Sequence, residues 1–317
     1  MSEAQRSRRQ ARLTRHEQLM RQRQYLHIDA AGRASFIELP EQSVNKNSER
    51  VLVTTPESKS AWVHEVFESI SDDYDRMNDV ESFRMHRSWK QTLVMEVLQS
   101  VDEMLADAML GDASSTEGMG VTPVILDVAC GSGDIVLALA SLMPEAKVVG
   151  LDFSENMLAV AKRRAADAIA ADADTTLPEF MHGNAMHLPF ADNSIDVLTI
   201  SFGLRNLPDY QAALIEFARV LRPGGSFFCL ESSYPTSPVI KPFFKVYFRH
   251  LMPRMASLVV GHRQQYQWLN DSTEVFLSKS ELADMMQECG FIEIGIQSFF
   301  FGVAAIHSGR LPVQQAG

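Results

Sequence analysis

Hydrophobic positions follow a helical pattern only from Trp62 onward. Residues 1 to about 60 contain few large apolar side chains, and Gln, Arg and Ser recur there without periodicity. From Trp62 the apolar side chains at 62, 63, 66, 67 and 70 fall on one helical face, and a second helical stretch runs from about Met85 to Leu105. The sequence therefore predicts an unstructured N-terminal segment followed by a folded domain.

Beyond residues 111–120, whose small and polar side chains predict a loop, short apolar runs alternate with amphipathic stretches. The apolar runs predict strands at 124–128, 147–151, near Phe180, and at 196–202, 226–230, 292–300 and 302–306. Helices are predicted at 133–142, from Ser154, at 209–221 up to the Arg222-Pro-Gly-Gly225 stop, in segments to Phe276, and at 278–289. The last begins with a Ser278–Glu281 capping box. This alternation predicts an α/β fold with a mostly parallel seven-stranded sheet and helices on both faces.

Composition and charge exclude several classes of protein. The 317 residues are 46% hydrophobic and 22% charged, which is typical of a globular protein. The net charge of −11 argues against nucleic-acid binding, which needs a basic surface. No apolar run approaches the ~20 residues of a membrane span, and the N-terminus lacks the apolar core of a secretory signal. The three cysteines are far apart, so we expect neither a metal site nor disulfides, and a cytoplasmic protein.

The N-terminal segment is distinguished by its charge. Its first 24 residues contain seven Arg, no Lys and two Glu. We expect residues 1–60 to form a disordered Arg-rich tail, residues 61–310 one domain, and residues 311–317 a short C-terminal tail. A mitochondrial presequence and a tether to an anionic surface are the alternatives for the Arg-rich segment.

The most informative segment for chemistry follows the first predicted strand and reads Asp127-Val-Ala-Cys-Gly131-Ser-Gly133-Asp134. Gly131 and Gly133 allow a tight turn and a close approach of the backbone to a ligand. A dinucleotide-binding fingerprint would need a third small residue where this chain has Val136. The loop therefore favours a ligand without phosphates.

Polar residues also end the next two predicted strands. Asp152 can accept hydrogen bonds from both hydroxyls of a ribose, and Gly183-Asn184-Ala185 is placed to meet an adenine edge. Together with the acidic start and the short Gly loop, they resemble a class I S-adenosylmethionine-dependent methyltransferase, which has a Rossmann-like fold. The simpler alternative is that Asp152 caps the helix starting at Ser154, and the two roles are compatible.

Longer motifs narrow the resemblance. They are Phe67-Glu-Ser-Ile-Ser-Asp-Asp-Tyr74-Asp-Arg-Met-Asn78, Phe83-Arg-Met-His86-Arg-Ser-Trp89-Lys90, Ser201-Phe-Gly-Leu-Arg205-Asn206, Tyr266-Gln-Trp-Leu269 and Gly302-Val-Ala-Ala-Ile-His307. These motifs resemble the ubiquinone/menaquinone biosynthesis C-methyltransferase family over about residues 62–310. Segments 150–158, 182–186 and 230–233 look most like members that methylate demethylmenaquinone. The N-terminal tail and residues 111–120 depart from the family pattern.

The resemblance implies both a methyl donor, S-adenosyl-L-methionine, and its binding residues. The residues expected to contact the cofactor or to form its loop are Asp127, Gly131, Ser132, Gly133, Asp152, Asn184, Ala185 and Ser201. It also implies the substrate, a prenylated quinol, with 2-demethylmenaquinol converted to menaquinol.

The same resemblance places Arg205 and Asn206 beside the transferred methyl group, with Tyr74 and His86 as further catalytic candidates. Loss of a phenolic proton makes the quinol ring more nucleophilic, and an arginine, which stays charged, would stabilise the phenolate. The base is open between Tyr74, His86, Asp134 and a bound water. Arg205 is alternatively a structural salt bridge, and His86 is alternatively structural.

A basic amphipathic segment suggests how a greasy substrate could be reached. Lys241, Lys245 and Arg249 lie four residues apart, opposite a face of aromatic and leucine side chains. This predicts either a helix at the membrane surface, on its inner face, or an ordinary surface helix packing its aromatic side chains inward. A homodimer is a further expectation about partners.

Three other functions compete with this interpretation. The nearest is C-methylation of 2-polyprenyl-6-methoxy-1,4-benzoquinol in ubiquinone biosynthesis, which uses the same fold and chemistry. A nicotinamide-dependent oxidoreductase is disfavoured by Val136. A non-catalytic protein that binds the cofactor would keep all the same residues.

Overall fold

The computed structural model describes residues 26–28, 34–36, 79, 82, 84–110, 122–171, 177–233, 235 and 276–313. The chain divides into two compact units, Met1–Trp62 and Val63–Gly317. In the first unit, strands β1 (Leu26–Ile28) and β2 (Ala34–Phe36) pair antiparallel, which the sequence did not predict. The predicted helical face at 62–70, the loop at 111–120 and the amphipathic segment at 241–249 lie outside the described residues. The predicted tails and domain boundaries stay predictions.

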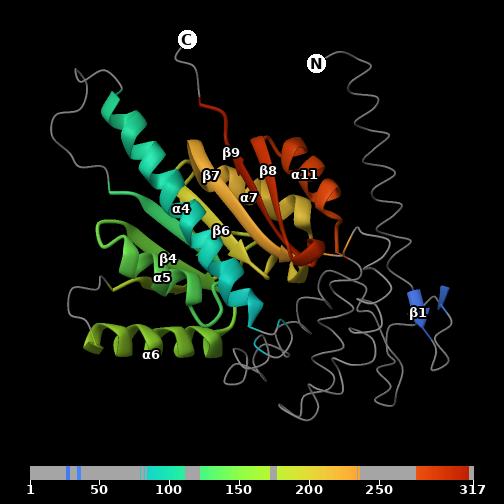
Figure 1. Cartoon of the computed structure of the whole chain (residues 1–317), viewed down its shortest axis with the longest axis horizontal. Helices are drawn as coiled ribbons and strands as arrows, with labels where there is room; N and C mark the ends of the chain where they lie inside the picture. The colour runs from blue at the N-terminus through green and yellow to red at the C-terminus, as the bar shows by residue number, and fades with distance from the viewer. Residues whose placement is uncertain are drawn as a thin grey trace. The chain divides into compact units, whose positions relative to one another are not determined.

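The second unit contains a seven-stranded sheet with the order β5-β4-β3-β6-β7-β9-β8 (Figure 1). Its strands are β3 (Val124–Val128), β4 (Lys147–Asp152), β5 (Glu179–His182), β6 (Ile195–Ser201), β7 (Leu221–Ser232), β8 (Ile292–Phe299) and β9 (Ala304–Arg310). All neighbours are parallel except that β9 runs antiparallel to both β7 and β8. The predicted fold class is confirmed. The strand order reverses at β3, and such a reversal places ligands at the carboxyl ends of the strands.

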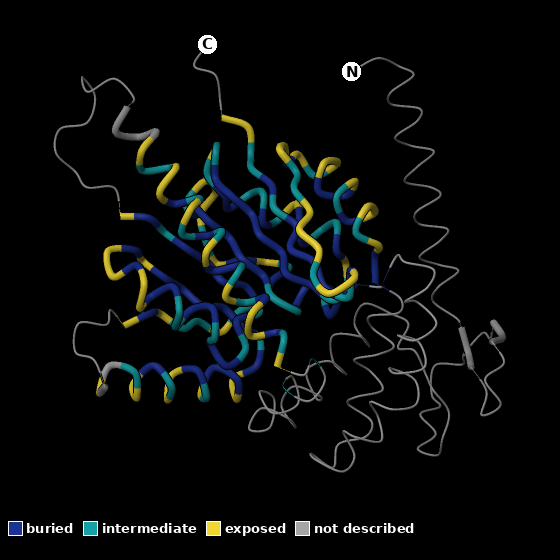
Figure 2. Tube along the Cα trace, viewed as in Figure 1, coloured by how far each residue is buried: buried dark blue, intermediate teal, exposed yellow. Residues whose placement is uncertain are grey.

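Helices cover both faces of this sheet. They are α4 (Met85–Leu110), α5 (Asp134–Leu142), α6 (Glu155–Ala171), α7 (Tyr210–Val220) and α11 (Lys279–Glu288), with short 3₁₀ turns η1 (Leu204–Asn206) and η3 (Phe300–Gly302). Adjacent side chains of β3 point to opposite faces. Ile125 packs in a cluster with α4 and α5, whereas Leu126 packs in a second cluster with α7 and α11. The inner strands of the sheet are accordingly mostly buried, whereas the edge strands β5 and β8 are partly exposed and the helices are exposed on their outer sides (Figure 2).

Two elements differ from their predicted form. Helix α7 ends at Val220 and β7 begins at once, because Leu221 already pairs with Ile195 and residues 222–225 bulge out before Ser226 pairs with Val197. The predicted turn therefore lies inside the strand. On β8 the register shifts between Ile292 and Gly295, where Glu293 has a φ of 54°.

The start of α11 follows the sequence closely. The Ser278 hydroxyl accepts a hydrogen bond from the Glu281 backbone N–H, and the Glu281 carboxylate accepts one from the Ser278 N–H at 2.9 Å. This is the predicted capping box, and Gly290, with a φ of 99°, follows the end of the helix as expected. Among the described helices, none is both long enough and apolar enough to span a bilayer.

A close approach inside the sheet predicts one sensitive glycine. A Cβ atom at Gly150 on β4 would lie 2.8 Å from Val136 and 2.9 Å from the Cys130 sulfur. Gly150→Ala should therefore lower the free energy of unfolding by about 1–3 kcal/mol, the usual cost of overpacking, measured by urea denaturation. Gly295→Ala is the matched control, since its Cβ would meet only the Ser308 hydroxyl, which can rotate away. Equal stability of the two variants would contradict the prediction.

Candidate active site

The glycine loop lies at the carboxyl end of β3, where the strand order reverses. Its backbone turns sharply, with φ values of 55° at Ala129, 54° at Gly131 and 85° at Gly133. At Gly133 a Cβ atom would also lie 3.1 Å from the Ala161 side chain on α6 and 3.3 Å from the Phe180 ring on β5. Gly133 is thus required both by its backbone conformation and by the close packing of α6 and β5 around the loop.

Asp152 fixes the loop from the neighbouring strand. One carboxylate oxygen accepts a hydrogen bond from the Gly131 N–H at 2.8 Å, and the other accepts one from the Ser154 N–H at 2.9 Å. The cap of α6 is Ser154 itself, whose hydroxyl accepts a hydrogen bond from the Met157 N–H. Asp152 therefore holds the loop rather than capping the helix. A carboxylate offers about four lone pairs, which leaves acceptor capacity for ribose hydroxyls, and that role stays a prediction.

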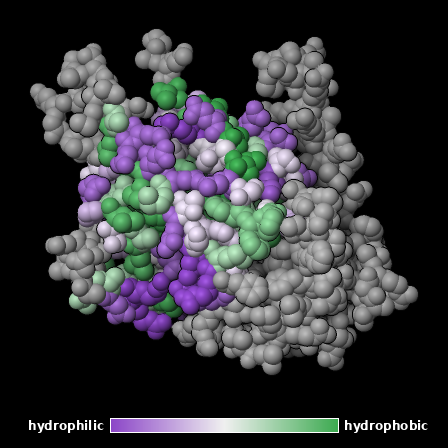
Figure 3. Space-filling model, viewed as in Figure 1, coloured by the Kyte–Doolittle hydropathy of each residue, from purple (hydrophilic) through white to green (hydrophobic). Residues whose placement is uncertain are grey.

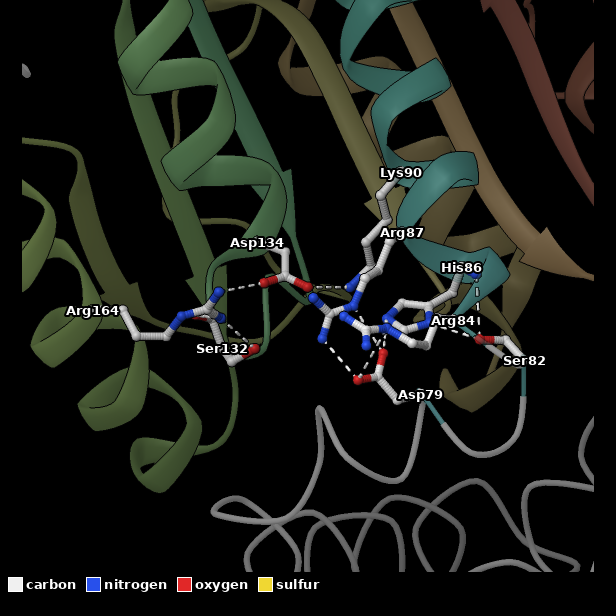
Figure 4. A network of polar contacts seen from close by, with 9 residues as sticks. All are labelled: Asp79, Ser82, Arg84, His86, Arg87, Lys90, Ser132, Asp134 and Arg164. Atoms are coloured by element: carbon white, nitrogen blue, oxygen red, sulfur yellow. Dashed lines mark hydrogen bonds and ion pairs between the residues drawn. The ribbon is translucent and has the colours of Figure 1, made fainter.

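A network of charged side chains closes around Asp134 at the start of α5 (Figure 4). Lys90 of α4 donates to one of its carboxylate oxygens at 2.7 Å, and Arg164 of α6 donates to the other at 2.6 Å. Arg164 also donates to the carbonyl oxygen and the hydroxyl of Ser132, at 2.8 and 3.0 Å. Three helices are thereby joined at the glycine loop.

This network argues against Asp134 as a base. Burial alone would raise the pKa of Asp134, but the cations of Lys90 and Arg164 hold it well below its ordinary value. A carboxylate that is strongly acidic and already paired with two cations is a poor proton acceptor. Asp134 is therefore a structural ion pair.

His86 lies at the start of α4 and is buried. Its Nδ1 lies 2.7 Å from the Ser82 hydroxyl, and its Nε2 lies 3.9 Å from a carboxylate oxygen of Asp79, which itself accepts two hydrogen bonds from Arg87 (Figure 4). Burial, together with the charge of Lys90, lowers the pKa of His86 from 6.5 to about 4. At neutral pH the ring is uncharged and weakly basic, which favours its structural interpretation. Tyr74 lies outside the described residues.

Asp127 lies in β3, below the loop, and is fully enclosed. The Thr199 hydroxyl of β6 donates to its carboxylate at 2.6 Å. Burial raises the pKa of Asp127 from 3.8 to about 7, although Thr199 and Lys90 act in the opposite direction. Because its pKa is about 7, this buried carboxyl is only partly ionised at neutral pH.

Arg205 and Asn206 form η1, just beyond the end of β6. The Arg205 guanidinium forms an ion pair with Glu231 of β7, and the Arg205 backbone N–H donates to the same carboxylate at 3.2 Å. Both side chains are at most 5% exposed. The salt-bridge alternative for Arg205 is thus present in the structure, and it does not exclude catalysis, because a guanidinium carries five N–H donors.

Two buried acceptors stand out beside this ion pair. Within the part of the chain that the structure describes, the Ser201 hydroxyl and the Asn206 side-chain oxygen have no hydrogen-bond partner. The Asn206 amide nitrogen donates to the Phe202 carbonyl oxygen at 3.2 Å, which fixes the direction of the free oxygen. Buried polar atoms are nearly always paired, so these two point to hydrogen bonds from a ligand.

The end of β5 completes this edge of the sheet. The Asn184 side-chain oxygen accepts a hydrogen bond from the Met186 N–H at 2.9 Å, and Ala185 is buried. Asn184 thus holds its own turn, and its predicted contact with the cofactor stays a prediction. Among the described residues, no cluster of His, Cys, Asp or Glu is arranged to hold a metal ion.

The residues suit the predicted cofactor better than a dinucleotide. Val136 is fully buried and fills the space beside Gly150, so the start of α5 has no third glycine for a pyrophosphate to approach. The orphaned Ser201 hydroxyl adds an acceptor at the same edge.

Sequence reasoning did not assign a role to four side chains of this site. They are Lys90, Arg164, Thr199 and Glu231. Lys90 and Glu231 belong to motifs already noted, but their partners, Asp134 and Arg205, lie 44 and 26 residues away. Only the register of the sheet and the packing of α4 and α6 bring these pairs together.

Comparison with known proteins identifies relatives along most of the chain. The model of the ubiE/COQ5 methyltransferase family matches residues 55–310. Over 248 residues the chain is 42% identical to the demethylmenaquinone methyltransferase of Staphylococcus aureus strain JH9, covering 78% of this chain and 92% of that relative. The enzyme of strain Newman aligns over the same length with the same identity.

Solved structures agree on the fold. Magnesium protoporphyrin IX methyltransferase from Synechocystis PCC 6803, with bound SAH, superposes with a TM-score of 0.53 at 17% identity, covering 79% of this chain and 99% of that one. Its complex with SAM gives a TM-score of 0.50 at 17% identity, covering 80% and 97%. At this level of identity the similarity concerns the fold alone.

The raised pKa of Asp127 predicts a pH-dependent stability. A carboxyl whose pKa is higher in the folded state holds its proton more tightly there, so its stabilising contribution is full below about pH 4 and is lost as the pH rises through about 7. Asp127→Asn should remove this loss, so the variant gains stability relative to the wild type between pH 4 and 7. Urea denaturation at several pH values measures this difference.

Two further variants sharpen this test. Thr199→Val removes the hydrogen bond to the ionised form, so the loss of stability should extend to higher pH. Asp102→Asn alters an exposed carboxyl of α4 and serves as the control. If Asp127→Asn and the wild type show the same pH dependence, Asp127 does not titrate in this range.

Proposed function

The chain belongs to the ubiE/COQ5 methyltransferase family, and we propose from this that it methylates a ring carbon of 2-demethylmenaquinol, forming menaquinol. It is an S-adenosylmethionine-dependent methyltransferase of menaquinone biosynthesis. The observation that carries the choice of substrate is the 42% identity to a demethylmenaquinone methyltransferase over 92% of its length. In the overall reaction the donor loses its methyl group, a ring C–C bond forms, and the ring C–H proton leaves.

The cofactor, when bound, supplies an electrophilic methyl group. We assign its ribose to Asp152, which already holds the loop, and further contacts to Asn184, Ala185 and the free Ser201 hydroxyl. Arg164 supports the loop through Ser132. These residues bind and orient the donor before chemistry begins.

The substrate ring is assigned to the end of β6. The free Asn206 oxygen accepts a hydrogen bond from a quinol hydroxyl and so orients the ring. Because Glu231 balances its charge, Arg205 admits a neutral quinol, and its preoriented N–H groups donate to the oxygen as negative charge develops there. Glu231 acts as a positioning residue for Arg205.

The two candidate bases that the structure describes, His86 and Asp134, are both poor proton acceptors. A phenol has a pKa near ~10, whereas the pKa of His86 is lowered to about 4, so transfer to His86 is strongly uphill. Asp134 is a weaker base still. Neither described residue is therefore favoured as the base. A bound water, itself a weak base, would only relay the proton to solvent, and Tyr74, which lies outside the described residues, stays a proposal.

The alternative substrate is the benzoquinol of ubiquinone biosynthesis, whose methylation uses the same fold and chemistry. Contact with the membrane and a homodimer remain part of the proposal, supported by the prenylated substrate and by the amphipathic pattern at 241–249. A nicotinamide oxidoreductase is disfavoured by the buried Val136.

The deciding experiment is turnover of purified protein with chemically reduced demethylmenaquinol and labelled cofactor, followed by mass spectrometry. We expect a product heavier by one methyl group, and no product from the oxidised quinone, because only the quinol ring is electron-rich. The benzoquinol substrate is run in parallel. Methylation of the benzoquinol alone would favour the alternative, and no turnover with either quinol would contradict the enzyme assignment.

Arg205 provides a second test. Arg205→Ala should lower kcat by about 10²–10³, the usual cost of losing one preorganised donor, and Arg205→Lys should restore only part, since an ammonium lacks the planar fork. Cofactor affinity, measured by calorimetry, should hardly change. Near-normal turnover would remove Arg205 from catalysis.

Removing Arg205 alone leaves Glu231 as an unpaired buried charge and destabilises the fold. The double variant Arg205→Met/Glu231→Gln avoids this and should fold while remaining slow. Arg222→Ala breaks an ion pair with Asp196 at the opposite end of β6, where the arginine is more exposed, and is the control for loss of an ion pair away from the site. Normal turnover in the double variant would show that the pair is structural only.

A further inference from the structure

Three consecutive phenylalanines, Phe299 to Phe301, lie at the carboxyl end of β8. Since β9 is antiparallel to both β7 and β8, β8 runs in the same direction as β7 and ends at the same edge of the sheet as the glycine loop and η1. Phe299 ends the strand, and Phe300 and Phe301 form η3 with Gly302. These phenylalanines therefore lie at the same edge of the sheet as the candidate active site.

The backbone at this point is strained. Phe300 and Phe301 have φ values of 39° and 59°, and Gly302 follows at 89°. Bulky residues rarely adopt positive φ, and such strain persists only where the surrounding structure imposes it, often at binding sites. Ser233 imposes it here, because its hydroxyl donates to the Gly302 carbonyl oxygen at 2.6 Å and its N–H donates to the Val303 carbonyl oxygen at 2.8 Å.

The three rings have different surroundings. Phe299 stacks on Trp89 of α4, with ring centroids 6.1 Å apart. Phe300 and Phe301 instead contact each other edge to face and are 58% and 63% exposed. On the face seen in Figure 3, apolar residues form separate patches among polar ones. A strained backbone that presents two phenylalanines to solvent indicates a binding surface rather than core packing.

The turn that carries this pair is attached to elements that also carry residues of the candidate active site. Ser233, which holds η3, lies two residues beyond Glu231, the partner of Arg205. Trp89, which packs against Phe299, is followed by Lys90, the partner of Asp134 at the glycine loop. The turn that carries the pair is thus held by residues of α4 and of the end of β7, which also carry Lys90 and Glu231.

We propose that Phe300 and Phe301 form the docking surface for the first isoprenoid units of the substrate's prenyl chain. The inference rests on the proposed function, because a prenyl chain begins at the ring that Arg205 and Asn206 hold. Its methyl-branched, uncharged hydrocarbon complements two adjacent aromatic rings, which bury apolar surface without needing a polar partner. Among the described residues this surface consists of two adjacent rings, which suits a single hydrocarbon chain better than a protein partner, whose interface is much larger.

The test compares two substrates, a demethylmenaquinol with several isoprenoid units and 1,4-naphthoquinol without a chain. The variant is Phe300→Asn/Phe301→Asn, because asparagine tolerates positive φ and keeps the turn while removing both rings. For the prenylated substrate in detergent micelles, KM should rise by at least about tenfold, which corresponds to ~1.4 kcal/mol. KM for the chainless quinol, kcat and cofactor affinity should stay near the wild-type values.

Leu142→Asn is the matched control, since Leu142 is 56% exposed at the far end of α5 and should leave both KM values unchanged. An unchanged ratio of the two KM values in the double variant would overturn the inference. A rise in KM seen only with substrate in phospholipid vesicles, and not in micelles, would also overturn it in favour of a membrane contact. Failure of the wild type to methylate either quinol would instead overturn the proposed function.

Discussion

The architecture of the site depends on the carboxylate of Asp152. Asp152 ends β4, where it accepts hydrogen bonds from the glycine loop after β3 and from Ser154, just before α6. Burial raises the pKa of this carboxyl, and the hydrogen bonds that it accepts from the backbone N–H groups of Ser154 and Gly131 act in the opposite direction. The same hydrogen bonds hold Gly131 in the conformation that lets a ligand approach the backbone. The geometry of the loop thus depends on one side chain, to which we also assign the cofactor's ribose.

The elements of the fold could be predicted from the sequence because their signals are local. The Ser278 capping box needs only four residues, and the strand pattern needs only a few apolar positions. The bulge at 222–225 could not be predicted, because Pro and Gly stop a helix equally well before a strand or within its first residues. The strands β1 and β2 carry no strong pattern in a segment rich in polar residues.

The polar residues of the site were predicted less completely than the fold, for a physical reason. Motifs place Asp134 and Arg205 at strand ends, but the state of each is set by partners that are distant in sequence. Lys90 and Arg164 turn Asp134 from a candidate base into an ion pair, and Glu231 balances the charge of Arg205. Similarly, Thr199 and complete burial set the proton affinity of Asp127. The charge state and proton affinity of these side chains follow from tertiary packing, which a short motif does not reveal.

The two ends of the sheet have a consequence for how copies of the chain can associate. An edge strand offers unpaired backbone groups to any neighbouring strand. At one end β5 has only four residues, and at the other β8 is twisted by the irregularity at Glu293, an exposed carboxylate. Both devices discourage a second sheet from adding at either edge. The outer strands of this sheet therefore oppose its self-association into a continuous fibre-like ribbon.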